Sequence, residues 1–176
     1  MSDDITAELD RFRENLFKAF NQGDYRAMLE KYCHKDVIAT WQDGTTSQGY
    51  DGVLAEFDKL SKFIKKMLVQ PTTDMRLVLF DGKLAVSSGN MRDTYDLVRG
   101  GQGIQHGPAK VALESRWSAT LIKEKDEWIL VSFSASTNAF NNEVVSLYLR
   151  RTMFLSAGIA SLVGLVAGFV IRMLIG

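Results

Sequence analysis

Residues 111–137 read VALESRWSATLIKEKDEWILVSFSAST. Two runs rich in β-branched and aromatic residues, 111–122 and 128–137, flank the charged segment KEKDE at 123–127. Such runs on either side of a short polar segment predict an antiparallel hairpin. Strand-like sequence also precedes this hairpin, which is therefore expected to be the last part of a sheet.

The earlier strands follow the same pattern. Residues 75–80 and 84–88 flank Asp81-Gly82, a strong signal for a short hairpin, and residues 91–98 continue in an extended conformation. Segment 99–108, RGGQGIQHGP, predicts a long connection between strands. It contains Gly-x-Gly, but no helix follows that could bind a phosphate at its N-terminus.

Helices are predicted before these strands. Residues 4–20 carry apolar side chains at helical spacing, and Asp24 is a suitable N-cap for a second, short helix. Residues 37–41 predict a first strand. A third helix is predicted from Asp51 to Pro71, with one polar face that carries Lys59, Lys62, Lys65 and Lys66. The fold class is therefore α+β, a curved antiparallel sheet packed on N-terminal helices.

The end of the chain has a different composition. Residues 153–171, MFLSAGIASLVGLVAGFVI, contain no charge and no proline. At a helical rise of about 1.5 Å per residue they would cover roughly 29 Å, the thickness of a bilayer core. The alternative is a long helix buried in the domain. The predicted organisation is an α+β domain at 1–138, a helical connector at 139–152 and one transmembrane helix at 153–175.

This helix would be a C-terminal tail anchor in a single-pass topology. The acidic sequence at the N-terminus predicts no secretory signal, and Arg150 and Arg151 favour a cytoplasmic position for the soluble domain. Ala160, Gly164 and Gly168 recur at helical spacing, which predicts contact with a second membrane helix. The expected partners are the lipid bilayer and either a homo-oligomer or other membrane subunits.

Composition excludes several classes of site. The chain has 21 basic and 21 acidic residues, so it lacks the positive charge of a nucleic-acid-binding surface. The single cysteine, Cys33, allows no intrachain disulfide. His34 and His106 have no neighbouring ligands at metal-site spacing, so neither a metal nor another cofactor is predicted.

Several short motifs resemble the nuclear transport factor 2-like superfamily, in particular its SnoaL-like branch. They are the break at Gly23-Asp24, Tyr32 ahead of Asp36-Val37, Trp41 with Asp43-Gly44, the segment GYDGV at 49–53, and the ending EWILVSFSAS at 127–136. The resemblance covers residues 5–138. It implies a cone-shaped α+β barrel with a cavity between sheet and helices, found both in isomerases, dehydratases and cyclases and in non-catalytic assembly modules.

This sequence departs from the family's usual pattern at one position that concerns catalysis. Related SnoaL-like proteins often carry a histidine on the last strand, two positions before a serine. Ser134 and Ser136 occupy the matching positions here, so the imidazole is missing. A hydroxyl cannot act as a base near neutral pH without help. This departure argues against an enzyme, and no catalytic residue is assigned.

Five side chains are candidates for contact with a ligand in the cavity: Tyr32, Trp41, Asp93, Tyr95 and Ser134. The alternation along 91–98 is not regular enough to decide whether Asp93 or Asp96 faces inward.

Two functions remain. The first is a membrane-tethered, non-catalytic oligomerisation or docking module, an accessory subunit of a membrane complex. The second is a small-molecule isomerase, cyclase or dehydratase, or a binder of a hydrophobic ligand.

Overall fold

The computed structural model describes residues 3–99 and 110–137. Helix α1 (Asp3–Gln22) leads into α2 (Tyr25–Tyr32), β1 (Cys33–Thr40) and β2 (Thr46–Gln48). Helix α3 (Gly49–Ser61) is followed by β3 (Ile64–Pro71) and β4 (Met75–Leu79). Three long strands complete the order: β5 (Leu84–Leu97), β6 (Lys110–Glu124) and β7 (Glu127–Thr137).

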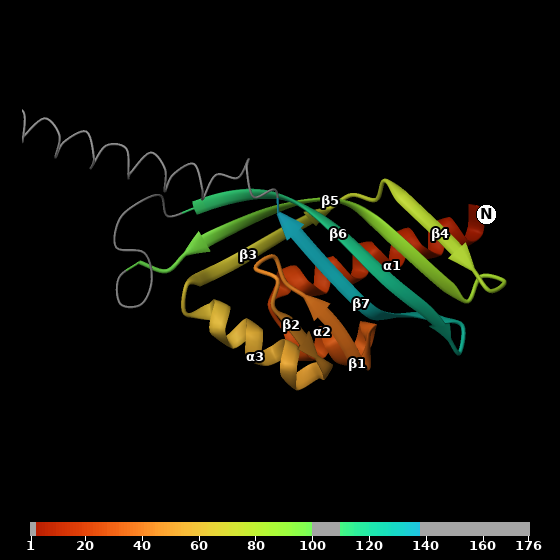
Figure 1. Cartoon of the computed structure of the whole chain (residues 1–176), viewed down its shortest axis with the longest axis horizontal. Helices are drawn as coiled ribbons and strands as arrows, with labels where there is room; N and C mark the ends of the chain where they lie inside the picture. Colours follow the sequence, from red (N-terminus) through yellow and green to blue (C-terminus); the bar gives the residue numbers. More distant parts are fainter. Residues whose placement is uncertain (1–2, 100–109, 138–176) are drawn as a thin grey trace, which may run out of the picture. The chain divides into compact units, whose positions relative to one another are not determined.

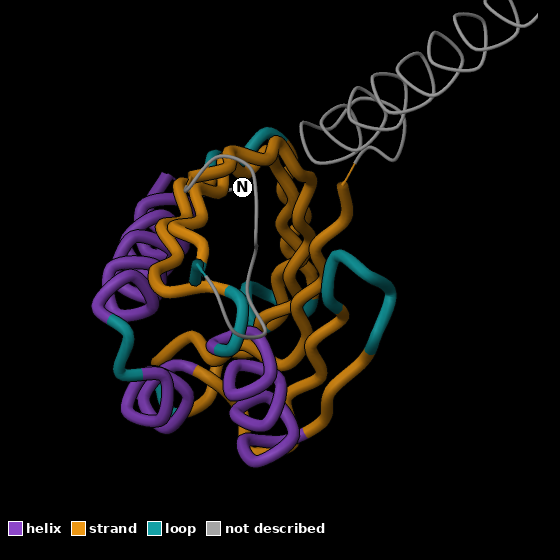
Figure 2. The backbone as a smooth tube through the Cα atoms, turned by 90° about the vertical axis from the view of Figure 1, so that its left-hand side faces the viewer, coloured by secondary structure: helices purple, strands orange, loops and turns teal. Residues whose placement is uncertain are grey.

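The strands form one curved sheet in the order β2-β1-β7-β6-β5-β3, with β4 also paired to β5. Strand β5 therefore has two partners on one side, β4 at its first half and β3 at its second. The three helices lie on one side of the bent sheet (Figures 1 and 2). The α+β class and both predicted hairpins, β4–β5 and β6–β7, are confirmed.

The prediction of a wholly antiparallel sheet is wrong. Strand β1 pairs with β7 in parallel, with Ala39 opposite Phe133 and Thr40 opposite Ser134. The two strands lie far apart in sequence, so no short turn forces them to be antiparallel, and the helices and strands between them provide the long crossover that a parallel pair requires. The sheet is mixed.

The predicted third helix is also too long. Helix α3 ends at Ser61, and Ile64 and Met67 lie in β3, where Met67 pairs with Tyr95. A tight turn, in which the amide of Phe63 donates to the carbonyl of Leu60 at 3.0 Å, separates the two elements. Apolar residues three positions apart are compatible with a helix. Here, however, the segment is a strand, and its backbone groups are satisfied by pairing with β5. Lys65 and Lys66 are consequently exposed on β3, not on a helix.

Helix α1 packs its apolar stripe on the inner face of the sheet. Leu9, Leu16 and Phe17 are buried against a core that includes Trp117 and Leu121 of β6. Polar contacts fix the position of this helix. The side chain of Asn21 accepts a hydrogen bond from the Val69 amide and donates one to the Val69 carbonyl, each at 2.9 Å.

The described residues contain no helix long and apolar enough to cross a membrane. The predicted connector and transmembrane helix, with Ala160, Gly164 and Gly168, lie outside the described residues, as does His106.

Candidate functional site

A buried carboxylate lies on the inner face of the sheet. Asp93 is 0% exposed and belongs to the inward-facing row of β5, which also contains Ala85, Ser87 and Met91. Asp96 faces outward and pairs with Lys110 at 3.4 Å. The structure thus decides between the two acids: Asp93 is the interior one.

Three neutral side chains donate hydrogen bonds to one oxygen of Asp93. Gln42 Nε2 lies 2.6 Å from Oδ2, Ser115 Oγ lies 2.9 Å from it, and the Tyr95 hydroxyl lies 3.3 Å from it. The Tyr95 hydroxyl is also 3.2 Å from Gln42 Oε1. These four residues are called the Asp93 cluster below.

The second oxygen of Asp93 differs from the first. Oδ1 is buried and has no hydrogen-bond partner among the described residues. A buried acceptor without a partner costs about 1–3 kcal/mol. The carboxyl is therefore held strongly through one oxygen only, which leaves the other able to accept a hydrogen bond.

Burial determines how this cluster titrates. It raises the pKa of Asp93, although the hydrogen bonds from Ser115, Gln42 and Tyr95 oppose the shift. Burial, followed by the nearby charge of Asp93, also raises the pKa of Tyr95. The phenol therefore remains neutral at physiological pH and serves as a hydrogen-bond donor.

The other predicted ligand-facing residues lie elsewhere. Tyr32 packs edge-on against Phe12 of α1, with ring centroids 5.8 Å apart. Trp41 immediately precedes Gln42, but its indole nitrogen donates to Ser47 Oγ at 2.9 Å. The five predicted residues are therefore not brought together as one set.

The structure does not bring Ser134 to the cluster. The register of β7 against β6 shifts between Thr120 and Leu121, which re-aims the following side chains. Phe133 consequently lines the interior and Ala135 is buried. Ser134, between them, pairs with the exposed Ser118 of β6 and lies on the opposite face of the strand.

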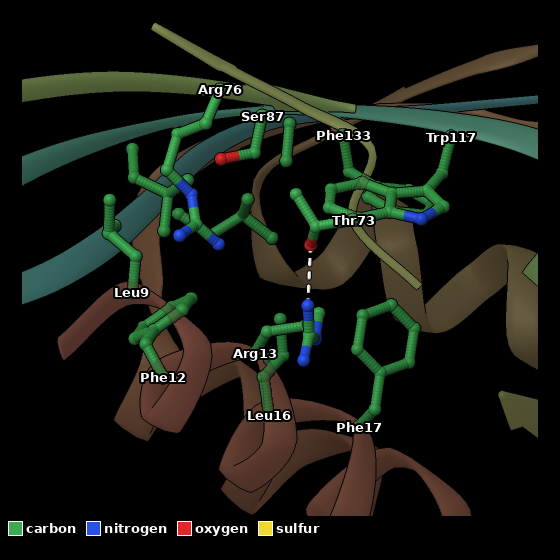
Figure 3. Close-up of a pocket in the computed structure, with 13 residues that line it drawn as sticks. Leu9, Phe12, Arg13, Leu16, Phe17, Thr73, Arg76, Ser87, Trp117 and Phe133 are labelled. Atoms are coloured by element: carbon green, nitrogen blue, oxygen red, sulfur yellow. Dashed lines mark hydrogen bonds between the residues drawn. The ribbon is translucent and has the colours of Figure 1, made fainter. Parts of the chain in front are cut away.

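The space between α1 and the sheet is nearly filled. Its cavity of about 20 Å³ is lined mainly by apolar side chains, among them Leu9, Phe12, Leu16 and Phe17 (Figure 3). That volume holds roughly one water molecule. Arg13 Nη1 donates to Thr73 Oγ1 at 2.5 Å across this space.

Other reactive groups of the described residues form no site. The thiol of Cys33 is buried, which raises its pKa to about 12. His34 Nδ1 accepts a hydrogen bond from the amide of Asp36, so His34 helps to shape the start of β1. Within residues 3–99 and 110–137 no three His, Cys, Asp or Glu side chains are grouped to hold a metal ion.

Apolar side chains also gather on the outside of the domain. Met75, Leu77 and Leu79 of β4 are 63%, 55% and 41% exposed, and Phe80, in the turn that follows, is 72% exposed. Val86, opposite Leu77 on β5, is 37% exposed. These five residues are called the β4 patch below.

No protein-family model and no curated protein matches the chain. Solved structures do match. A nuclear transport factor 2-like superfamily protein from Salmonella enterica serovar Typhimurium has a TM-score of 0.61 at 13% identity, over 79% of this chain and 94% of that one.

Two further structures give the same result. Hexachlorocyclohexane dehydrochlorinase LinA-type3 from Novosphingobium barchaimii matches with a TM-score of 0.61 at 11% identity, over 76% of this chain and 86% of that one. A nuclear transport factor 2-like protein of unknown function from Shewanella oneidensis matches with a TM-score of 0.53 at 16% identity, over 74% and 98%. Identities this low establish the fold alone, which is nuclear transport factor 2-like.

Proposed function

We propose that this protein is a non-catalytic docking and oligomerisation module, held to the cytoplasmic side of a membrane by residues 153–175 as an accessory subunit of a membrane complex. The β4 patch is the observation that carries the proposal. Large apolar side chains grouped on the surface of a monomer are typical of a protein-binding site.

The interior supports the same proposal. A cavity of about 20 Å³ between α1 and the sheet cannot admit an organic substrate. Asp93 is 0% exposed, whereas a catalytic base must reach its substrate. The described interior therefore resembles a protein core more closely than an active site.

Native mass spectrometry of the full-length chain, purified in a mild detergent, tests the docking role. An assembly with itself or with defined subunits is expected. A monomer without any partner would contradict the proposal.

The tether is tested separately by membrane fractionation. The full-length chain is expected in the membrane fraction at alkaline pH, and Leu165→Asp is expected to release it, because a charge at the centre of a bilayer is costly. A wild-type chain that fractionates with soluble protein would remove the membrane part of the proposal.

The Asp93 cluster favours a second candidate, a binder of a hydrophobic ligand or an enzyme related to the dehydrochlorinases in fold. Its basis is the free Oδ1 beside three fixed donors on Oδ2. Chloride release from hexachlorocyclohexane, measured for the wild type and for Asp93→Asn, tests one such activity. The docking proposal expects no release from either, whereas release that Asp93→Asn abolishes would favour the enzyme.

A further inference from the structure

Strand β4 lies at the margin of the sheet (Figure 1). Among the described residues it pairs with β5 alone, so the backbone groups on its other side have no strand partner there. An unpaired edge of this kind is a template for another strand, and proteins usually protect it with lysine or proline.

The neighbouring edge strand shows such protection, and β4 does not. Strand β3 also pairs with β5 alone within the described chain, but it carries Lys65 and Lys66 and ends at Pro71. Strand β4, MRLVL, has one charged residue, Arg76. Its guanidinium donates to Asp10 on α1 at 2.8 Å, so it is directed to the inner side and leaves the edge uncharged.

We propose that β4 pairs in antiparallel fashion with β4 of a second copy of this chain, across a two-fold axis at Leu77. The two sheets would then join edge to edge. This inference rests on the proposed docking function and identifies the partner.

The sequence of β4 is complementary to itself in this register. Leu77 lies opposite Leu77 of the partner subunit, and Met75 lies opposite Leu79 of the partner subunit. Side chains two apart share a face, so all these apolar groups gather on the outer face, where each copy exposes them. Arg76 lies opposite Val78 of the partner subunit, so no like charges meet across the axis.

Charge argues against a lipid surface as the occupant. The turns beside the β4 patch carry both signs, with Asp81 and Lys83 in one and the sequence KEKDE in the other. Binding to an anionic membrane requires a cluster of basic residues. The neutral, apolar edge suits a second protein strand instead.

The paired segment is short, five residues from each copy. Its area lies well below the ~1,200–2,000 Å² of a stable interface, so association in dilute solution is expected to be weak. The experiments therefore use the full-length chain, both in detergent at high concentration and in its own membrane.

Cysteine cross-linking tests the register. In the proposed dimer the two Leu77 Cα atoms lie roughly 4.5–5.5 Å apart, within disulfide range. Mild oxidation of Leu77→Cys is expected to give a covalent dimer on a non-reducing gel. Cys33 is buried, so it should not compete.

Met75→Cys is the matched control, because its two copies would lie roughly 13 Å apart. It should not cross-link with itself, but should do so when mixed with Leu79→Cys. A Leu77→Cys thiol that reacts with maleimide but forms no dimer would overturn the proposed pairing, as would equal cross-linking by Met75→Cys alone.

Native mass spectrometry with Leu77→Lys tests the same contact in a different way. A lysine on the edge should lower the dimer fraction at least ~tenfold. Leu68→Lys, on the outer face of β3 at 39% exposure, is the control and should leave the dimer intact. Circular dichroism establishes that both variants are folded.

The outcomes separate the two proposals. A dimer that survives Leu77→Lys overturns the β4 pairing but leaves a docking module. A single copy bound to other defined subunits overturns the second copy as partner and also leaves the docking role. A single copy bound to nothing overturns both.

Discussion

Leu121 and Leu77 belong to the same sheet, yet Leu121 is 4% exposed and Leu77 is 55% exposed. On the inner face, even a carboxylate, Asp93, is completely buried. On the outer face, four large apolar side chains of β4 and its turn remain in water: Met75, Leu77, Leu79 and Phe80. The usual distribution of polar and apolar groups is thus reversed at these two places.

Each reversal has a cost and needs a compensating interaction. Asp93 obtains one within the chain, from Gln42, Tyr95 and Ser115. Among the described residues, nothing covers the β4 patch. The inner exception is therefore largely satisfied within the fold, whereas we propose that the outer one is covered by a partner. This difference is why the docking role is proposed for β4 and not for the interior.

The largest effect is expected at Gly89 of β5, where the backbone at Thr72 packs closely against the strand. A Cβ added at Gly89 would lie 1.7 Å from the carbonyl oxygen of Thr72, in the link between β3 and β4. Backbone would have to move, so Gly89→Ala should cost about 4 kcal/mol or more of unfolding free energy. Urea denaturation measures this loss.

Gly52 provides the control for that substitution. It lies in α3, and an added Cβ would come no closer than 3.8 Å to Ser47. Gly52→Ala should be neutral or stabilise the protein by up to about 1 kcal/mol, since alanine favours a helix. If the two variants were equally stable, the backbone between β3 and β4 could not be packed closely against Gly89.

The next prediction compares the two leucines directly. Leu121→Ala leaves a space in the core and should cost about 2–5 kcal/mol. Leu77→Ala removes an exposed side chain and should change the stability of the monomer by less than about 0.5 kcal/mol, while weakening association. Chemical denaturation at low protein concentration measures both values. Equal losses would show that Leu77 is part of the core and would remove the basis of the β4 patch.

The pH dependence of stability tests the buried carboxyl of Asp93 on the inner face. Burial raises the pKa of Asp93, so the folded protein keeps this proton at pH values where the unfolded chain has lost it. Stability should therefore fall as pH rises from near 4 to the raised pKa, by about 1.4 kcal/mol for each unit between the two pKa values. The stability of Asp93→Asn relative to the wild type should therefore increase across this pH range, as measured by thermal unfolding.

Glu8, in the same domain, is expected to give the opposite pH dependence of stability. A hydrogen bond from Lys123, with another from Trp128, lowers the pKa of Glu8. Its contribution to stability is present at neutral pH and is lost as pH falls through the lowered pKa. Glu8→Gln should be less stable than the wild type at neutral pH and approach it in acid. Relative to the wild type, the stability of Glu8→Gln and that of Asp93→Asn should thus change with pH in opposite directions. A change in the same direction for both variants would contradict the assigned pKa shifts.

The sequence predicts those parts of this fold that depend on neighbouring residues. Both hairpins are confirmed, because Asp81-Gly82 and the segment at 123–127 act locally. Segment 64–71 is predicted wrongly as helix, because its conformation depends on pairing with β5, and the paired residues lie twenty or more positions apart in sequence. The parallel pairing of β1 with β7 escapes prediction for the same reason.

The candidate site likewise contains residues that the sequence identifies and residues that it misses. Asp93 and Tyr95 are named from sequence among the candidates for ligand contact, although the sequence does not decide whether Asp93 or Asp96 faces inward. Gln42 and Ser115 are missed, because they reach Asp93 across 51 and 22 residues. Their only local signals are weak: Gln42 follows Trp41 at the end of a strand, and Ser115 shares an alternating row with Trp117 and Ala119. The β4 patch is equally hidden, since alternation in MRLVL does not reveal which face stays uncovered.

The smallest effect concerns Phe80, the most exposed member of the β4 patch. Its backbone has φ of 51°, in the left-handed region that a bulky side chain rarely adopts and that asparagine tolerates. Phe80→Asn should therefore stabilise the isolated domain by about 0.5–1 kcal/mol. Lys125, in the other hairpin turn, has φ of 49°, so Lys125→Asn should give a similar gain. The two variants should differ only in association, measured by native mass spectrometry, because Phe80 belongs to the proposed docking surface and Lys125 does not. Equal association of both variants with the partner would restrict that surface to β4 itself and exclude its turn.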